Sequence, residues 1–205
     1  MFDFFFLPYE QASWIQILLE ALVFVFGIVS VLCAKKESIW VYPTGLIATI
    51  IATYLLYQVK YFGDMAINAY YTIMSLYGWY KWASKKEEKQ LPISRITRRE
   101  VVIGFALFLL TMVFTYFIYV FFDYKLEIPN YIDIFTSGIF FTAMWYMALK
   151  KIENWTLWII GDFIAIPLFA YRGLGMLALQ FIIFTILAIL ALIEWKKILN
   201  NNLQK

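Results

Sequence analysis

One acidic residue stands in the middle of an otherwise apolar stretch of the chain. The segment ENWTLWIIGDFIAI runs from Glu153 to Ile166, and Asp162 lies inside its apolar part. On a helix Trp155, Trp158 and Asp162 occupy positions i, i+3 and i+7, so the three side chains share one face. Two indole rings beside a carboxylate can hold a flat cation through stacking, cation–π attraction and ion pairing. The segment therefore predicts a binding site for a flat, positively charged ligand.

The composition of the chain makes this aspartate costly. Of 205 residues, 63% are hydrophobic and 15% are charged, whereas soluble domains have about 45–50% apolar and about 25% charged residues. With a mean hydropathy of +0.74, we expect an integral membrane protein. A charged aspartate facing lipid at mid-membrane would cost at least about 2.5–3.5 kcal/mol, so Asp162 must face the bundle interior or a water-filled cavity. The lack of histidine excludes histidine-ligated zinc and serine–histidine catalysis, and the single Cys33 excludes an intramolecular disulfide.

Seven apolar runs are long enough to cross the hydrocarbon, which takes about 20 residues for about 30 Å. We therefore expect an all-α integral membrane protein with seven transmembrane helices. Most of the 17 lysines and arginines fall in the loops of one side, leaving Lys60, Lys125 and Arg172 on the other. Cytoplasmic loops carry such an excess, so we expect the N-terminus outside and the C-terminus inside. The expected helices are 14–34, 39–58, 64–82, 100–122, 131–149, 154–171 and 174–195.

The helices divide into two similar triplets around one linking helix. Glu20 and Asp133, in the first helix of each triplet, are each followed 62 residues later by a tryptophan, Trp82 and Trp195. The motif KKESIW, between the first and second helices, resembles KKIENW, between the fifth and sixth. Transporters commonly place their substrate site near the midplane, between such repeats. We expect a single transmembrane domain, 1–205, with a 3+1+3 parallel repeat of 14–82, 100–122 and 131–195.

Two amides complete the candidate site. Asn68 and Gln180, in the third and seventh helices, are nearly equivalent in the repeat and could supply directional hydrogen bonds or hold neighbouring helices together. Trp155 lies near the inner interface, where it could equally be a belt anchor, and Asp162 could cap a neighbouring polar group. The expected substrate-binding residues are Trp155, Trp158, Asp162, Asn68 and Gln180. No phosphate-binding glycine loop appears, so we expect neither ATP-driven transport within this chain nor a cofactor or metal.

The motif ENWTLW at the head of the sixth helix, with SLYGWYKW closing the third, resembles the PnuC family of vitamin transporters. The likeness runs from Trp14 to Trp195. It implies a seven-helix 3+1+3 architecture related to SWEET sugar transporters, assembled as a homotrimer in the bacterial cytoplasmic membrane. It also implies facilitated uptake of nicotinamide riboside, trapped by a cytoplasmic kinase, or of thiamine or riboflavin in related branches.

The resemblance assigns positions as well. Trp155 and Trp158 match the family's paired tryptophans, whereas Asp162 and Ala48 stand where members often have asparagine, and Asn68 where glutamine is often found. Nicotinamide riboside carries a pyridinium and thiamine a thiazolium. An aspartate suits either cation and argues against neutral riboflavin. We therefore expect uptake of a cationic aromatic B vitamin, with nicotinamide riboside first and thiamine as the alternative.

Other functions fit less well. A sugar carrier stays open, because indole rings also stack on sugar rings. An intramembrane aspartyl protease would pair Asp133 with Asp162, but we expect Asp133 near the outer end of its helix and Asp162 at the centre, so we expect no enzyme. A retinal protein needs a lysine in the last helix, and 174–193 has none. The basic segment 81–99 includes glutamates, which favours a cytoplasmic loop near anionic lipid over a nucleic-acid surface.

Overall fold

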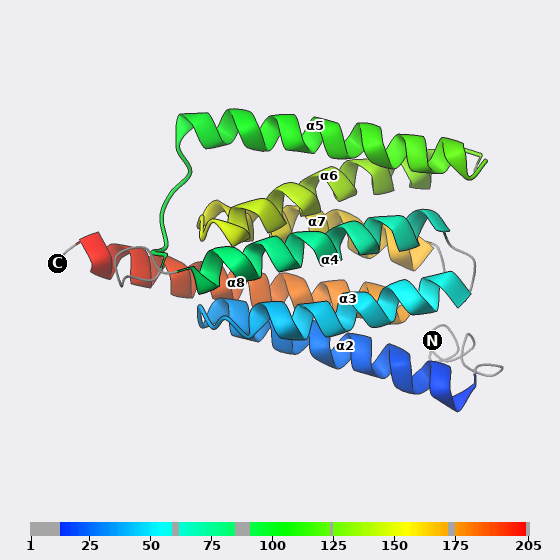
Figure 1. Cartoon of the computed structure of the whole chain (residues 1–205), viewed down its shortest axis with the longest axis horizontal. Coiled ribbons are helices and arrows are strands. Elements are labelled where there is room, and N and C mark those ends of the chain that lie inside the picture. Colours follow the sequence, from blue (N-terminus) through cyan, green and yellow to red (C-terminus); the bar gives the residue numbers. More distant parts are fainter. Residues whose placement is uncertain (1–12, 59–61, 85–90, 124, 172–174, 204–205) are drawn as a thin grey trace.

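Seven long helices lie side by side in the computed structural model (Figure 1), which describes residues 13–58, 62–84, 91–123, 125–171 and 175–203. The expected all-α membrane architecture is confirmed. In this described part of the chain α2, α5, α7 and the stretch Met176–Asn201 are each long and apolar enough to cross a membrane. The helices are α2 (Trp14–Lys35), α3 (Val41–Gln58), α4 (Phe62–Ala83), α5 (Arg98–Phe121), α6 (Ile128–Ala148), α7 (Glu153–Tyr171) and α8 (Gly175–Leu203).

The helix ends follow local signals. Thr97 and Glu100 form a capping box that starts α5 just before the expected position. Pro129, in the first turn of α6, suits a helix start because its missing N–H has no intrahelical partner there. The last helix differs most from expectation, since α8 continues past Trp195 to Leu203. The residues after Trp195 include neither proline nor glycine, so nothing in them stops the helix.

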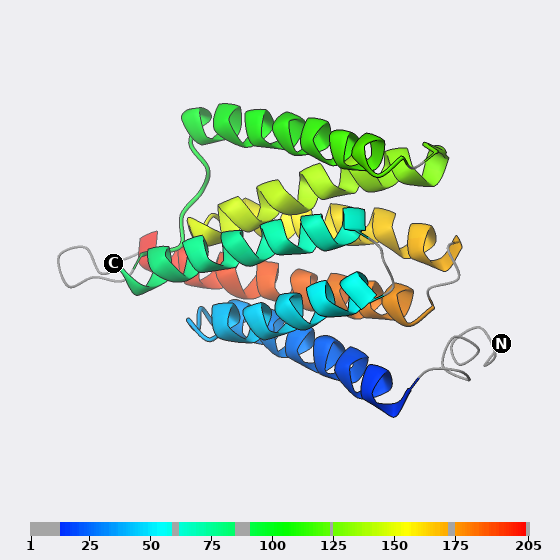
Figure 2. The same cartoon turned by 45° about the vertical axis from the view of Figure 1, so that its right-hand side comes forward.

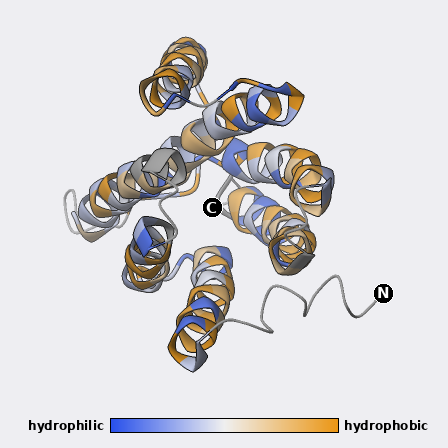
Figure 3. Cartoon of the chain, turned by 90° about the vertical axis from the view of Figure 1, so that its right-hand side faces the viewer, coloured by the Kyte–Doolittle hydropathy of each residue, from blue (hydrophilic) through white to orange (hydrophobic). Residues whose placement is uncertain are grey.

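Apolar side chains cover the outward faces of the bundle. On α5, Val102 is 69% exposed and Phe121 is 82% exposed. Helix α5 lies at one edge of the bundle beside α6, and hydrophobic colouring extends over its outer side (Figures 2 and 3). Such a surface requires lipid as its solvent. The chain is therefore a multi-pass membrane protein.

At one end of the bundle α2, α4, α6 and α8 finish, and α3, α5 and α7 begin. We name it the basic end, because Lys36, Lys81, Arg98 and Lys151 lie there. It contains both ion pairs of the described residues, Glu37 with Lys150 and Glu100 with Lys151.

The α2–α3 and α6–α7 turns at the basic end follow the same backbone path. Glu37 and Lys150 both adopt positive φ, of 54° and 50°. Their amides donate to the carbonyls of Ala34 and Met147 at 3.0 and 2.9 Å. These equivalent residues are 113 positions apart. The structure therefore corrects the expected match of KKESIW with KKIENW, which would have placed Glu37 opposite Ile152 instead of Lys150.

The same separation relates two tryptophans that bond between the helix groups α2–α4 and α6–α8, which we name the first and second triplets. The Trp82 indole N–H, at the end of α4, donates to the Met147 carbonyl of α6 at 3.1 Å. The Trp195 indole N–H, on α8, donates to the Ala34 carbonyl of α2, also at 3.1 Å. Tyr42 meets Trp82 edge-to-face at 5.2 Å, as Trp155 meets Trp195 at 5.4 Å. We name these rings the anchor cluster: Tyr42, Trp82, Trp155 and Trp195.

An ion pair joins the two turns across the anchor cluster. Lys150 Nζ lies 3.0 Å from Glu37 Oε2, and the two side chains are 4% and 25% exposed. The same ammonium lies 4.5 Å from the centre of the Trp82 ring. Because a buried charge is tolerated only when it is paired, the ion pair and the ring account for the burial of Lys150.

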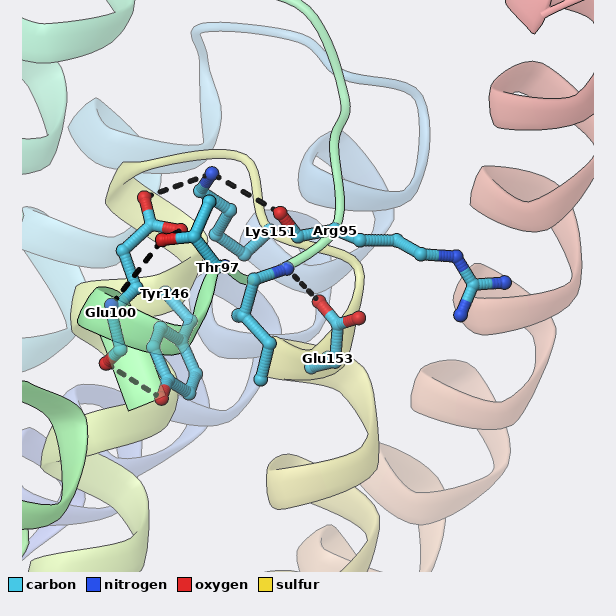
Figure 4. Close-up of polar contacts among 7 residues, drawn as sticks. Arg95, Thr97, Glu100, Tyr146, Lys151 and Glu153 are labelled. Atoms are coloured by element: carbon cyan, nitrogen blue, oxygen red, sulfur yellow. Dashed lines mark hydrogen bonds and ion pairs between the residues drawn. The ribbon is translucent and has the colours of Figure 1, made fainter. Parts of the chain in front are cut away.

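A short segment, Leu91–Thr97, crosses the α6–α7 turn like a strap. Ser94 N–H donates to the Lys150 carbonyl at 3.1 Å, and the Ile152 N–H returns a bond to Ser94 at 3.0 Å. Figure 4 shows Lys151 Nζ between the Glu100 carboxylate, at 2.9 Å, and the Arg95 carbonyl, at 3.3 Å. Among the described residues the α2–α3 turn takes part in no such bridge. The strap thus fastens the second triplet to the start of α5.

Candidate functional site

Helix α7 carries the central acid. Glu153 lies in its first turn, where a carboxylate favours the positive end of the helix dipole. Asp162 lies at the centre of the helix, about 14 Å from its first residue at about 1.5 Å per residue. It belongs to the buried face and is 2% exposed. The expectation that Asp162 faces the protein interior agrees with this placement.

The Asp162 carboxylate has no counter-charge in the described structure. Its Oδ1 is buried and accepts no hydrogen bond from the residues that the structure describes. The ion pairs in that part of the chain join Glu37 to Lys150 and Glu100 to Lys151, both at the basic end. Burying an unpaired carboxylate costs several kcal/mol. A cationic ligand beside Asp162 would remove this cost.

Four aromatic side chains of α6, α7 and α8 form a stack that begins one helical turn from Asp162. Trp158, one helical turn before Asp162, stacks with Phe140 of α6 at 5.4 Å between ring centres. Phe140 stacks with Phe181 of α8 at 5.9 Å, and Phe181 with Phe169 of α7 at 5.1 Å. We name these four residues the aromatic stack. The rings lie nearly parallel, at interplanar angles of 27°, 12° and 16°, which is the geometry in which flat aromatic groups stack.

Gly161 makes room for this arrangement. A Cβ at that position would lie 2.4 Å from a ring carbon of Phe140. Any larger residue would therefore displace Phe140 from Trp158. The glycine lets α6 and α7 approach closely at the depth of Asp162.

Trp155 lies nearer the basic end than this pair. It is 2% exposed and contacts Trp195 in the anchor cluster. Its indole N–H makes no hydrogen bond to the described residues. The structure thus brings Trp158 together with Asp162, and places Trp155 about two turns below, in the packed aromatic core.

The two candidate amides lie on other helices. Gln180 of α8 is buried, and its Nε2 would lie 3.0 Å from a Cβ added at Gly27, so the amide faces α2. Asn68 is half-buried on α4, where its backbone carbonyl accepts from the Thr72 hydroxyl at 3.0 Å. Both amides come from helices other than α7, and each comes from a different triplet.

Helix α3 of the first triplet carries different side chains at the positions 113 residues before those of α7. A separation of 113 residues aligns Thr49 with Asp162 and Gly45 with Trp158. The Thr49 hydroxyl accepts from the Thr72 hydroxyl at 3.0 Å, so this position is neutral and satisfied. The same separation relates Ala48 to Gly161. At this position the second triplet carries an acid and the first triplet a neutral hydroxyl.

Asp133 of α6 already has a hydrogen-bond partner. The Tyr119 hydroxyl of α5 donates a short hydrogen bond to Asp133, so this carboxylate faces α5. That orientation separates it from Asp162 and does not favour an aspartyl dyad. Within the described ranges no three His, Cys, Asp or Glu residues cluster as metal ligands would.

Phe140, Phe169 and Phe181 are site candidates that sequence reasoning did not single out. The chain contains 20 phenylalanines, and no spacing distinguishes these three from residues that face lipid. Gly161, beside Asp162, was the one available signal, because a glycine at the centre of a helix often marks a close neighbour.

Comparison with known proteins gives a consistent result. A family model described as nicotinamide mononucleotide transporter matches residues 17–197. Two curated relatives, from Escherichia coli (strain K12) and Shigella flexneri, are each named nicotinamide riboside transporter PnuC. Each is 24% identical to this chain over 201 residues, and the match covers 86% of this chain and 82% of the relative. The crystal structure of the vitamin B3 transporter PnuC has a similar fold, with a TM-score of 0.71 and 22% identity over 96% of this chain and 86% of that one.

Proposed function

The chain belongs to the nicotinamide mononucleotide transporter family, and thus to the PnuC transporters, and from that membership we propose that it carries nicotinamide riboside across the membrane. One observation supports this substrate above others. The Oδ1 atom of the buried Asp162 accepts no hydrogen bond from the described residues, and the carboxylate lies one turn from Trp158 on the same helix. The riboside offers a flat pyridinium cation that would both stack and neutralise the acid.

The same chemistry favours the riboside over the mononucleotide. A phosphate group would bring negative charge close to Asp162. The described lysines and arginines lie in loops or near helix ends, so none of them is placed to offset that charge at mid-membrane. We therefore propose a nucleoside as substrate. Thiamine, whose thiazolium is also cationic, is the second candidate.

The transport cycle that we propose is alternating access between two triplets. The contacts that recur at a separation of 113 residues support a 3+1+3 parallel repeat, with 14–82 and 131–195 rocking about a midplane site. Trp158 and Asp162 would bind the heterocycle. Trp155, Asn68 and Gln180 would line the remainder of the path. The excess of basic residues supports a cytoplasmic basic end, with the N-terminus outside and the C-terminus inside.

Accumulation of the riboside inside the cell depends, in this proposal, on a second protein. A cytoplasmic kinase that phosphorylates the riboside would give it a negative charge, which Asp162 would repel, so the product would stay inside. We place the transporter in the bacterial cytoplasmic membrane as a homotrimer, on its resemblance to the PnuC family. Transport itself would be facilitated diffusion.

Calorimetric titration of the purified protein in detergent tests the substrate. Nicotinamide riboside, its mononucleotide, thiamine and riboflavin are titrated in parallel. We expect binding of the riboside and none of the mononucleotide or riboflavin. If thiamine alone binds, the second candidate is correct. If the riboside binds as tightly to Asp162→Asn as to the wild type, the hypothesis that Asp162 is its counter-charge is wrong.

A further inference from the structure

The ion pair at the basic end brings together an acid, an indole ring and a cation. Lys150 Nζ lies 3.0 Å from Glu37 Oε2 and 4.5 Å from the centre of the Trp82 ring. An acid and an indole are also the groups that Asp162 and Trp158 place one helical turn apart on α7. The described structure therefore repeats this combination at the basic end, where the lysine ammonium already occupies it.

Several contacts hold the Trp82 ring in place. Its indole N–H donates to the Met147 carbonyl at 3.1 Å, and Tyr42 packs edge-to-face against it at 5.2 Å. The Trp195 ring lies 6.4 Å from it, centre to centre, at an angle of 39°. The Lys150 ammonium lies over this fixed ring as a ligand cation would in a cation–π site.

The two charged partners are suited to exchange. The Glu37 side chain is 25% exposed, so the acid is partly accessible, whereas the Lys150 side chain is 4% exposed. A lysine ammonium stands on a flexible four-carbon stem and can swing away while the backbone stays in place. Packing alone does not call for charges here, because apolar residues of similar volume often stabilise a buried site as well as an ion pair does. An exchangeable cation is a role that apolar residues could not fill.

The pair also lies between Asp162 and the basic end. Glu37 and Lys150 bridge the two triplets, and the indole N–H groups of Trp82 and Trp195 bond between them at the same end. These contacts must part before a substrate at Asp162 can leave towards that end. Glu37 then loses the Lys150 ammonium, and the departing substrate is the cation nearest to replace it.

We propose that Glu37 and Trp82 form a second cation site, which binds the aromatic ring of the cationic substrate on its way to the basic end and which Lys150 occupies at other times. The ring stacks on Trp82 and pairs with Glu37 in place of the ammonium. Lys150 returns when the substrate leaves and joins the two triplets again. The substrate still moves only down its own gradient, as facilitated diffusion requires. This inference rests on the proposed function for the identity of the cation.

Calorimetric stoichiometry of the purified full chain in detergent tests the second cation site. Lys150→Met keeps the length of the side chain and removes its charge. With millimolar ligand, the wild type should bind one nicotinamide riboside per chain and Lys150→Met should bind two. Lys150→Arg, which keeps the cation, should bind one. The double variant Glu37→Gln with Lys150→Met, which lacks the acid, should also bind one.

A second readout uses N-methylnicotinamide, a pyridinium without the ribose. At about five times its dissociation constant, this probe should raise the unfolding midpoint of Lys150→Met about 2–4 °C more than that of the double variant. If Lys150→Met folds only when the probe is present during expression and purification, that rescue supports the site. Equal shifts in the two variants, or no folded Lys150→Met with or without the probe, would overturn it.

The second cation site and the proposed function fail separately. No riboside binding to the wild type would overturn the proposed function, while N-methylnicotinamide would still decide the second cation site. One riboside per chain in both the wild type and Lys150→Met would overturn the second cation site and leave the substrate assignment intact. A second riboside that survives the loss of the Glu37 carboxylate would overturn it as well.

Discussion

The two triplets make several similar contacts at the basic end and differ at mid-membrane. At the basic end Glu37 and Lys150 have the same backbone conformation, and Trp82 and Trp195 make matching bonds to the opposite triplet. At mid-membrane the position of Asp162 is held by Thr49 in the first triplet. Packing and backbone geometry are thus shared, whereas the charge belongs to one triplet. A symmetric scaffold with one charged half can bind an asymmetric ligand in a single orientation.

The largest expected effect concerns the charge itself. Asp162→Ala should weaken binding of nicotinamide riboside about 100-fold or more, since losing one partner of a buried charge pair costs about 2–5 kcal/mol. Thr49→Ala, the equivalent change in the first triplet, should weaken it less than about threefold, and Trp155→Ala should fall between the two. Calorimetry measures all three, after size-exclusion in detergent has checked folding. Equal losses for Asp162 and Thr49 would show that the charge does not distinguish the triplets.

The second largest effect should come from the ion pair of Lys150 with Glu37, which joins the two turns. Lys150→Ala leaves Glu37 beside the anchor cluster without its cation, which should cost about 3 kcal/mol of stability. Thermal unfolding in detergent would show this as a lower midpoint. The double change Glu37→Lys with Lys150→Glu should recover most of the loss, because the swapped lysine would meet Trp195 as Lys150 meets Trp82. A swap no better than the single change would refute the equivalence of the two turns.

Gly161 should give a smaller difference between the triplets. The residue 113 positions before it, in the first triplet, is Ala48. Gly161→Ala should displace Phe140 and cost about 1–3 kcal/mol of stability through overpacking. The riboside should also bind more weakly, because Trp158 would lose its stacked neighbour. Ala48→Gly, as the control, should cost only about 1 kcal/mol through helix propensity and leave binding unchanged. Thermal midpoints and calorimetry separate these outcomes.

The smallest effects should be equal in the two triplets. Trp82→Phe and Trp195→Phe each remove one indole N–H that crosses between triplets, at about 1 kcal/mol per hydrogen bond. Their thermal midpoints should therefore fall by similar amounts. A much larger fall for one of them would mean that the basic end is less symmetric than its contacts suggest.

The helices were predictable because their signal is local. Runs of about 20 apolar residues need no tertiary information, and the capping box at Thr97 accounts for a start that differed slightly from expectation. The predicted end of α8 was wrong. The polar residues after Trp195 suggested a loop, although none of them breaks a helix.

Of the candidate site, only the residues that lie together on one helix could be predicted from the sequence. Trp158 and Asp162 share a face by spacing alone, and the structure leaves them as neighbours. Phe140 and Phe181 reach the site from other helices, so their role depends on packing that no pattern encodes. The pairing of Glu37 with Lys150 was missed for the same reason, because the similar motifs suggested a register two residues away.

The strap has a mechanical consequence for a rocking carrier. Leu91–Thr97 ties the α6–α7 turn to α5, while among the described residues the α2–α3 turn carries no such bridge. We expect α5 to α8 to stay fixed during the transport cycle while α2 to α4 move. A spectroscopic label on α3 should then travel farther during turnover than one on α7.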